Sequence, residues 1–237
     1  MWKIVGLLFV LAIVWMLLPR SSANEEPFFD AIPFDVLEID AVLTPEECDA
    51  LMAHAKPNLA RSTVSTPTGN EVSSVRTSRQ VWVDKNNAEV GSIVRKMLGT
   101  MAKYTGTFDD ASYEQVQIAN YGPGQEYKPH YDACVSRKHC RDDPKIYRRA
   151  TMIVYLNDVP SGGQTAFPRV SREVRPRKGR AVLFYNVHDA DRLQEIEDSL
   201  HGGLPVGEGG EKWIANLWLN YEAPPQKEKR RKNKKNA

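Results

Sequence analysis

The chain has 237 residues, of which 41% are hydrophobic and 26% are charged. This composition excludes a largely disordered chain and supplies enough apolar side chains for a sizeable core. The net charge of +2 is unevenly placed: residues 227–237 carry a net +6 and residues 24–226 a net −6, so a mildly acidic body is followed by a basic tail. We expect no nucleic-acid partner.

The first segment of the chain is strongly apolar. Residues 4–18 form an unbroken apolar run flanked by Lys3 and Arg20. As a helix this run would be about 22 Å long, which is shorter than the roughly 30 Å hydrocarbon core of a membrane. Residues 1–23 are therefore interpreted as a signal peptide or a signal anchor. We expect a domain in the lumen of the endoplasmic reticulum, attached to the membrane if the segment is not cleaved.

Two helices are expected before the β-rich part of the chain. Residues 24–34 form a polar linker that contains prolines. Residues 43–57 then have a Thr at the N-cap position, a Pro at the first helical position and a Pro at the end, which predicts a helix. Residues 87–103 have apolar side chains at helical spacing, which predicts a helix packed on the core. His54, inside the first helix, is interpreted as a surface or packing residue.

From residue 113 onward the pattern changes to short β-rich runs separated by Gly, Pro and Asp. The runs are YEQVQIANY, ATMIVYL, TAFP, AVLFYN and KWIANLWLNY. They predict an α+β, mainly β fold in which an antiparallel barrel or sandwich follows the helices. Residues 134–149 are interpreted as a long charged connection between two strands. Residues 223–237 are interpreted as a basic, disordered tail in water, with a nuclear signal or an anionic partner as the alternative.

The three cysteines do not indicate a zinc site. In an oxidising compartment Cys134 and Cys140 could close a small loop, which would leave Cys48 unpaired. Two cysteines six residues apart, with His139 as a nearby histidine, do not form the usual C-x₂₋₄-C zinc pattern.

His130 and Asp132 are candidate metal ligands. On an extended strand, side chains two residues apart point to the same side, so both can face one metal ion. Two histidines and one carboxylate form the facial set that holds non-haem iron and leaves positions open. The third ligand should be a distant histidine, either His188 or His201. The sequence favours His201, because Lys212 follows it just before an apolar strand.

Lys212 is a lysine at the start of an aromatic and apolar run. Burying its ammonium is unfavourable unless it meets an anion, and a dicarboxylate co-substrate would supply one. The alternative is a lysine at the strand edge that reaches water.

Four stretches resemble the prolyl 4-hydroxylases, which are Fe(II)/2-oxoglutarate-dependent dioxygenases. They read NYGPGQEYKPHYD, RRATMIVYLNDVPSGGQTAFP, KGRAVLFYN and SLHGGLPVGEGGEKWIANLW. A weaker match, VRTSRQVWV, lies at residues 75–83. The resemblance covers residues 35–222 and implies a double-stranded β-helix (jelly roll) with N-terminal supporting helices, close to the catalytic domain of collagen-type alpha subunits.

The resemblance also implies roles for individual residues. Three residues would bind iron and form the catalytic centre: His130, Asp132 and His201. Three would hold 2-oxoglutarate, with the lysine paired to its distal carboxylate: Lys212, Tyr121 and Thr165. Three would contact the peptide substrate: Arg76, Ser78 and Trp218.

By this likeness the chain 4-hydroxylates peptidyl proline in proline-rich or collagen-like secretory proteins. It would use Fe(II), 2-oxoglutarate and O₂, with L-ascorbate to restore oxidised iron. We expect no obligatory partner subunit, because the chain has no room for the additional peptide-binding domain of collagen-type catalytic subunits. Two alternatives are a related dioxygenase that hydroxylates another residue or a free amino acid, and a catalytically silent jelly roll that binds extended peptides.

One departure from the family concerns the spacing of two residues. Lys212 follows His201 by eleven residues, whereas the family usually has ten. We expect the glycines of GEGG to absorb the additional residue as a bulge. Otherwise the lysine would point to the opposite face of its strand.

Overall fold

The computed structural model describes residues 34–66, 69–133, 146–188 and 194–222. The expected signal segment, the basic tail, nearly all of the expected linker and the two cysteines of the expected loop lie outside these ranges. Within them, no helix has the length and apolar character needed to cross a membrane. The domain bounds 35–222 stay a prediction.

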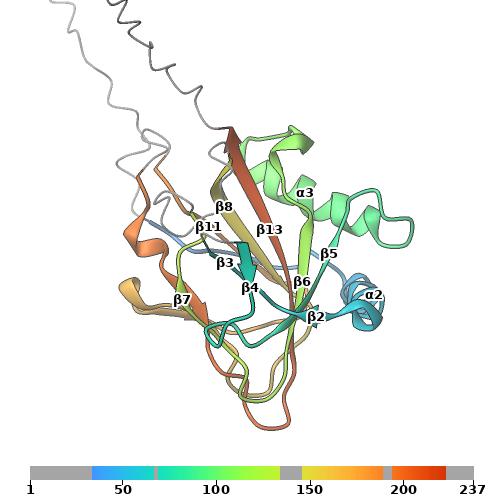
Figure 1. The fold of residues 1–237 in the computed structure, drawn as a ribbon. Coiled ribbons are helices and arrows are strands. Elements are labelled where there is room, and N and C mark those ends of the chain that lie inside the picture. Colours follow the sequence, from blue (N-terminus) through green and yellow to red (C-terminus); the bar gives the residue numbers. More distant parts are fainter. Residues whose placement is uncertain (1–33, 67–68, 134–145, 189–193, 223–237) are drawn as a thin grey trace, which may run out of the picture. The chain divides into compact units, whose positions relative to one another are not determined.

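Antiparallel strands form two sheets and a separate hairpin (Figure 1). The larger sheet has the order β1-β11-β8-β13-β6-β5-β2, the smaller sheet has the order β10-β9-β12-β7, and β3 pairs with β4. The strands are β1 (Leu37–Ile39), β2 (Ala60–Arg61), β3 (Val64–Thr66), β4 (Gly69–Glu71), β5 (Arg79–Val83), β6 (Val116–Tyr121), β7 (Tyr127–His130), β8 (Ile146–Tyr155), β9 (Thr165–Phe167), β10 (Arg172–Val174), β11 (Ala181–Tyr185), β12 (His201–Gly203) and β13 (Lys212–Glu222). This confirms the expected mainly β architecture.

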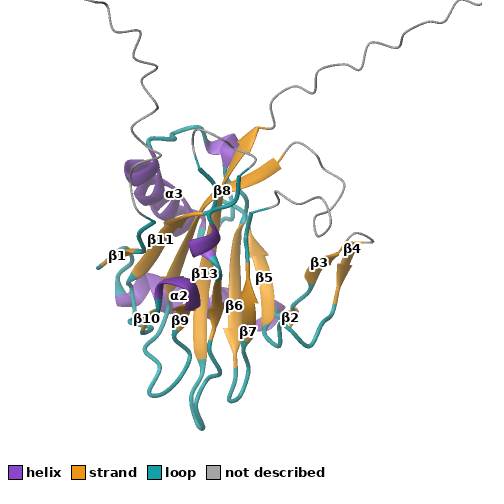
Figure 2. Cartoon of the chain, turned by 90° about the vertical axis from the view of Figure 1, so that its left-hand side faces the viewer, coloured by secondary structure: helices purple, strands orange, loops and turns teal. Residues whose placement is uncertain are grey.

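Two helices cover one side of the larger sheet, as Figure 2 shows for α2 (Pro45–Ala55) and α3 (Gly91–Thr105). Both expected helices are confirmed. In the first, Thr44 Oγ1 accepts from the backbone N–H of Glu47, and the Glu47 carboxylate accepts from the backbone N–H of Thr44, so a capping box starts the helix. Short 3₁₀ helices complete the elements: Lys56–Asn58, Asp110–Ser112, Pro168–Val170 and Glu197–Ser199.

Apolar side chains form two clusters, one on each side of the larger sheet. The outer cluster lies between this sheet and the helices, and includes Leu51, Met97, Met152 and Leu217. The inner cluster lies between the two sheets, and includes Tyr121, Tyr155, Phe167, Phe184 and Ile214. Because successive side chains of a strand point to opposite faces, β6, β8, β11 and β13 contribute to both clusters.

The edge strands of the larger sheet are short. Strand β1 pairs with β11 over three residues, and β2 pairs with β5 over two. Charged contacts surround β1: Glu38 accepts from Arg172 at 3.2 Å and from Arg180 at 2.6 Å. These arginines therefore hold β1 at the edge of the sheet.

Pairing between strands brings residues that are distant in the sequence together in each of the two sheets. In the smaller sheet, His201 on β12 is paired with His130 on β7. In the larger sheet, Lys212 on β13 is paired with Tyr121 on β6. His130, His201, Lys212 and Tyr121 therefore lie on strands, and Asp132 lies just beyond the end of β7.

Candidate active site

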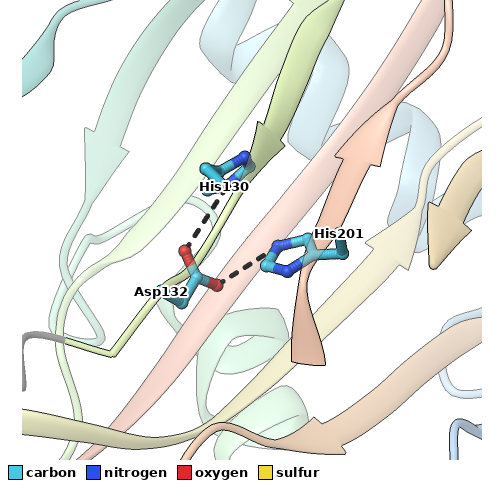
Figure 3. Close-up of side chains that lie close together, drawn as sticks. All are labelled: His130, Asp132 and His201. Carbon is cyan, nitrogen blue, oxygen red and sulfur yellow. Dashed lines mark ion pairs between the residues drawn. The ribbon is translucent and has the colours of Figure 1, made fainter. Parts of the chain in front are cut away.

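Three potential metal ligands come together between the sheets (Figure 3). His130 Nε2 lies 3.6 Å from Asp132 Oδ1, and His201 Nε2 lies 3.5 Å from Asp132 Oδ2. One ligand atom from each residue lies within 4.8 Å of the others. Two imidazole nitrogens and one carboxylate oxygen at this separation match the donor set of a non-haem iron site.

Both histidines are oriented through their second ring nitrogen. Nδ1 of His130 donates to the carbonyl oxygen of Lys128 at 2.9 Å, and Nδ1 of His201 donates to that of Ser199 at 2.9 Å. Because carbonyls only accept, the proton is on Nδ1 in each ring. The lone pair of each Nε2 is therefore directed at the carboxylate and is available to a metal ion.

The protonation states also suit metal binding. Burial, together with the nearby His130, lowers the pKa of His201 to about 4, so this ring is neutral at pH 7. Burial opposes ionisation of Asp132, but His201, His130 and the permanently charged Arg148, whose Nη1 lies 3.7 Å from Oδ1, hold the pKa of this carboxyl well below its ordinary value. Asp132 is therefore a carboxylate at neutral pH although it is only 8% exposed.

The Asp132 carboxylate is held by side chains of the larger sheet. Its Oδ2 accepts from Thr151 Oγ1 at 2.7 Å and from Trp218 Nε1 at 2.9 Å. The guanidinium of Arg148 lies 3.8 Å from the Trp218 ring centroid and donates to both oxygens of Glu114, at 2.7 and 2.8 Å. Arg148 thus fixes the indole that binds Asp132.

A stack of three side chains holds His130. The Tyr127 ring lies parallel to the His130 ring, with centroids 3.7 Å apart and an interplanar angle of 19°. The guanidinium of Arg76 lies 4.8 Å from the Tyr127 ring centroid. Arg76 in turn donates to Gln117 Oε1 at 2.6 Å. This stack links β6 to the metal ligand on β7.

Lys212 is a buried cation in the space between the sheets. Its Nζ lies 5.7 Å from the Tyr121 ring centroid and 5.8 Å from that of Tyr155. The side chain is 2% exposed, and no described residue forms a hydrogen bond or an ion pair with its ammonium. Burial lowers the pKa of Lys212 to about 7. A buried cation without an anionic partner indicates a binding site for an anion.

The ammonium of Lys212 has polar side chains near it, and the backbone of Gly203 lies close to it. The Tyr155 hydroxyl donates to Thr165 Oγ1 at 2.7 Å, and both side chains are buried. A Cβ atom on Gly203 would lie 3.5 Å from Lys212 Nζ. The structure therefore brings Tyr121, Thr165 and Lys212 close together between the two sheets.

The turn between β12 and β13 accommodates the additional residue before Lys212. The N–H of Gly210 donates to the carbonyl of Gly207 at 3.1 Å, and Gly209 has a φ of 70°, a conformation that favours glycine. Ile214, two residues beyond Lys212, lies in the inner cluster. Lys212 therefore points to the inner face of the sheet.

The residues expected to contact substrate are mainly buried. Arg76 donates to Gln117 and Ser78, and Ser78 Oγ lies 2.8 Å from Ser62 Oγ. Trp218 is buried with its indole on Asp132. These three side chains thus make contacts within the chain, and their role in binding substrate stays a prediction. Trp82 is 42% exposed, and its ring centroid lies 5.8 Å from that of Trp218.

Sequence reasoning missed several residues of the site. Thr151 and Tyr155 lie on β8, a β-rich run in which the sequence singled out no site residue. The strand alternation would have found them, because both share the inner face with Ile153. Arg148 and Glu114 carry no local signal, since charged residues near strand ends are common on protein surfaces.

Comparisons with known proteins agree with this geometry. Residues 116–220 match the 2OG-Fe(II) oxygenase superfamily. A putative prolyl 4-hydroxylase of Acanthamoeba polyphaga mimivirus is 34% identical over 185 residues, covering 76% of this chain and 72% of that protein. The prolyl 4-hydroxylase subunit alpha-1 of Gallus gallus is 32% identical over 188 residues, covering 76% of this chain but only 34% of that subunit.

A solved structure shares the fold. The viral collagen prolyl hydroxylase of Paramecium bursaria Chlorella virus-1, in its 2OG complex, superposes with a TM-score of 0.63 at 32% identity, covering 82% of this chain and 99% of that chain. A Pseudomonas putida prolyl-4-hydroxylase superposes with a TM-score of 0.54 at 21% identity, covering 80% and 94% of the two chains, which supports the fold alone. The expected jelly roll with N-terminal helices is confirmed.

Proposed function

Because the chain belongs to the prolyl 4-hydroxylase family of Fe(II)/2-oxoglutarate-dependent oxygenases, we propose that it hydroxylates C4 of proline residues in polypeptides. One observation carries the proposal: Lys212, a buried cation without an anionic partner among the described residues, lies in the same inner space as a group of two histidines and one carboxylate. A metal site alone is compatible with many reactions. A metal site beside a buried lysine is what a metal-bound dicarboxylate co-substrate requires.

The donor set fits Fe(II). His130 and His201 would each ligate through Nε2, because Nδ1 of each ring donates to a backbone carbonyl. Asp132 would ligate as a carboxylate through Oδ1, because Oδ2 already accepts two hydrogen bonds. The set has no thiolate, so soft metal ions are disfavoured among these ligands.

The side chains around Lys212 have the chemistry needed to bind 2-oxoglutarate. The ammonium would pair with the distal carboxylate, and the pairing is strong because the surroundings exclude water. The Thr165 hydroxyl accepts from Tyr155, which leaves its own proton for a carboxylate oxygen. Tyr121 would close the opposite wall, since Lys212 Nζ lies near its ring.

The chemistry itself comes from the bound groups. When bound, Fe(II) together with 2-oxoglutarate and O₂ supplies the oxidising power that converts 2-oxoglutarate to succinate and CO₂ and inserts one oxygen atom into the C4–H bond of proline. The residues of this chain orient these groups and keep water away from them. Phe184 contributes by packing its ring edge against His201, with centroids 4.7 Å apart.

The substrate that we propose is a proline-rich or collagen-like secretory polypeptide in extended polyproline II form. Such a segment is already extended, so an open aromatic surface can bind it at a low entropic cost. Trp82 supplies an exposed ring next to Trp218, and Val72 and Val75 are exposed in the segment that follows β4. We also propose L-ascorbate as the reductant for oxidised iron, a lumenal location in the endoplasmic reticulum, membrane attachment through an uncleaved N-terminal segment, and action without an obligatory partner subunit.

Succinate formation from 2-oxoglutarate tests the proposal. The full chain is incubated with Fe(II), O₂, ascorbate and either polyproline or (Pro-Pro-Gly) repeat peptides. We expect succinate release that depends on the peptide, with 4-hydroxyproline formed in equal amount. His130→Ala should abolish both products, while His54→Ala, which makes the same change on helix α2, should leave them intact.

Three outcomes would contradict the proposal. Peptide-dependent turnover by His130→Ala would reject the metal site. Turnover with lysyl peptides or free amino acids, and none with proline peptides, would identify a related dioxygenase of different specificity. Peptide binding by the wild-type chain without any succinate release would identify a silent binding protein.

A further inference from the structure

A chain of hydrogen bonds connects the Asp132 carboxylate to a buried asparagine at the end of β11. Thr151 Oγ1 donates to Asp132 Oδ2 at 2.7 Å, and Asn186 Nδ2 donates to Thr151 Oγ1 at 2.8 Å. Trp218 Nε1 donates to the same carboxylate oxygen at 2.9 Å. Thr151 is 1% exposed and Asn186 is fully buried. The contacts join three strands of the larger sheet to the ligand that follows β7.

The direction of each hydrogen bond follows from the chemistry of the groups. The ionised carboxylate of Asp132 can only accept, so the single hydroxyl proton of Thr151 is used there. Thr151 Oγ1 must then accept from its other neighbour, which fixes the Asn186 amide with Nδ2 towards Thr151. The hydrogen bonds therefore form a relay in which Asn186 donates to Thr151 and Thr151 donates to Asp132.

This relay makes the two oxygens of Asp132 different. Oδ2 accepts from Thr151 and Trp218, which uses both of its lone pairs. Oδ1 is 3.6 Å from His130 Nε2 and 3.7 Å from Arg148 Nη1, beyond ordinary hydrogen-bond distance. Within the described part of the chain, only Oδ1 therefore keeps lone pairs for a metal ion.

Fold stability alone does not explain why residue 186 is an asparagine. Its Oδ1 is buried and has no hydrogen-bond partner among the described residues. A buried acceptor without a partner is destabilising, so an apolar side chain of the same shape would suit this position better if packing were its only role. What the amide contributes is the Nδ2 donor to Thr151.

We propose that Asn186, acting through Thr151, is a positioning residue that makes Asp132 bind the metal ion through one oxygen, Oδ1. The inference rests on the proposed function, because it takes His130, Asp132 and His201 as the metal ligands. Residues that support a ligand from behind commonly change metal affinity by about 10- to 100-fold when they are replaced. Restricting the carboxylate to one oxygen keeps the remaining positions on the metal open for the co-substrate and O₂.

The decisive comparison uses two substitutions at Thr151. Thr151→Val keeps the shape of the side chain and removes the hydroxyl, whereas Thr151→Ser keeps the hydroxyl and removes a methyl group. Each full-chain variant is titrated with Co(II), and its visible ligand-field absorption is recorded. We expect Thr151→Val to bind Co(II) about 10- to 100-fold more weakly with a changed spectrum, and Thr151→Ser to resemble the wild type. A packing role predicts the reverse order, and that result would overturn the proposal.

Asn186→Leu separates the relay from fold stability. This substitution keeps the branched shape, removes the donor to Thr151 and removes the buried acceptor. We expect Co(II) affinity to fall by about tenfold or less while the melting temperature of the metal-free chain is unchanged or higher. A parallel fall in melting temperature and affinity would assign Asn186 a structural role.

Thr105→Val is the matched control, because Thr105 is also buried but its hydroxyl donates to Met101 O within helix α3. It should leave Co(II) binding unchanged. If the wild-type chain itself fails to bind Co(II), the proposed function fails together with the relay. If the wild type binds and turns over but Thr151→Val binds equally well, only the relay is rejected.

Discussion

The two faces of the larger sheet are built from the same strands but differ in chemistry. On the outer face, Met152 and Leu217 pack with the helices in a cluster of apolar side chains. On the inner face, their sequence neighbours Thr151 and Trp218 donate hydrogen bonds to Asp132. Neighbouring residues of one strand thus serve either the core or the site, and this separation allows the site to be changed with little effect on the core.

The largest expected effect is on the inner face. Replacing His201 by Ala removes one of three metal ligands, and because the metal provides several kcal/mol of transition-state stabilisation, turnover should fall roughly 1000-fold or more. The melting temperature of the metal-free chain should change little. Succinate release and thermal unfolding, each compared with His54→Ala, measure the two quantities. A large loss of stability would show that the two faces are not separable.

Leu217→Ala, on the outer face, should reduce stability and leave co-substrate binding unchanged. Leu217 is fully buried in the outer cluster, so its truncation should lower the free energy of unfolding by about 2–5 kcal/mol. Denaturant titration measures this loss, and Met97→Ala on helix α3 provides a second site in the same cluster. At a temperature where the variants remain folded, we expect wild-type KM for 2-oxoglutarate. A raised KM would show that packing on the outer face affects co-substrate binding on the inner face.

Lys212→Met removes the buried cation and keeps the length of the side chain. Loss of one partner of a buried charge pair commonly costs 2–5 kcal/mol of binding, so the KM for 2-oxoglutarate should rise about 100-fold. The unliganded chain should become more stable, because an unpaired buried ammonium is unfavourable. An unchanged KM would place the co-substrate elsewhere.

The smallest expected effect is on the pH dependence of co-substrate binding. Because burial lowers the pKa of Lys212 to about 7, the lysine of the unliganded chain loses its proton above this pH. A neutral lysine must take up a proton before it pairs with a carboxylate. The KM for 2-oxoglutarate should therefore rise about tenfold between pH 6 and pH 8. Lys212→Met should show a flat profile, and a flat wild-type profile would refute the assignment.

Much of the fold followed from local patterns. The two helices were readable from a capping sequence and from an apolar stripe, and the strands from short β-rich runs. His130, Asp132 and Lys212 stood out because their chemistry is unusual beside strands. The jelly roll and the choice of His201 over His188 depended on the family resemblance and on the lysine that follows His201.

The residues that support the metal ligands could not be predicted from the sequence, for a physical reason. Asn186 and Thr151 act through hydrogen bonds between strands that are 35 residues apart in the chain. Sequence patterns report the period of one strand and not which strand lies beside it. The stacking of Arg76 on Tyr127 was also not predicted, because this contact depends on pairing of its segment with β7.

The short edge strands described for the larger sheet also bear on how separate molecules meet. A sheet with long free edges presents unpaired backbone N–H and C=O groups that recruit strands from other chains. Here β1 offers three residues and β2 only two, and Arg172 and Arg180 bring charge to the β1 edge. Seven strands are thus assembled with little exposed template for aggregation, which suits an enzyme whose proposed substrates are themselves extended chains.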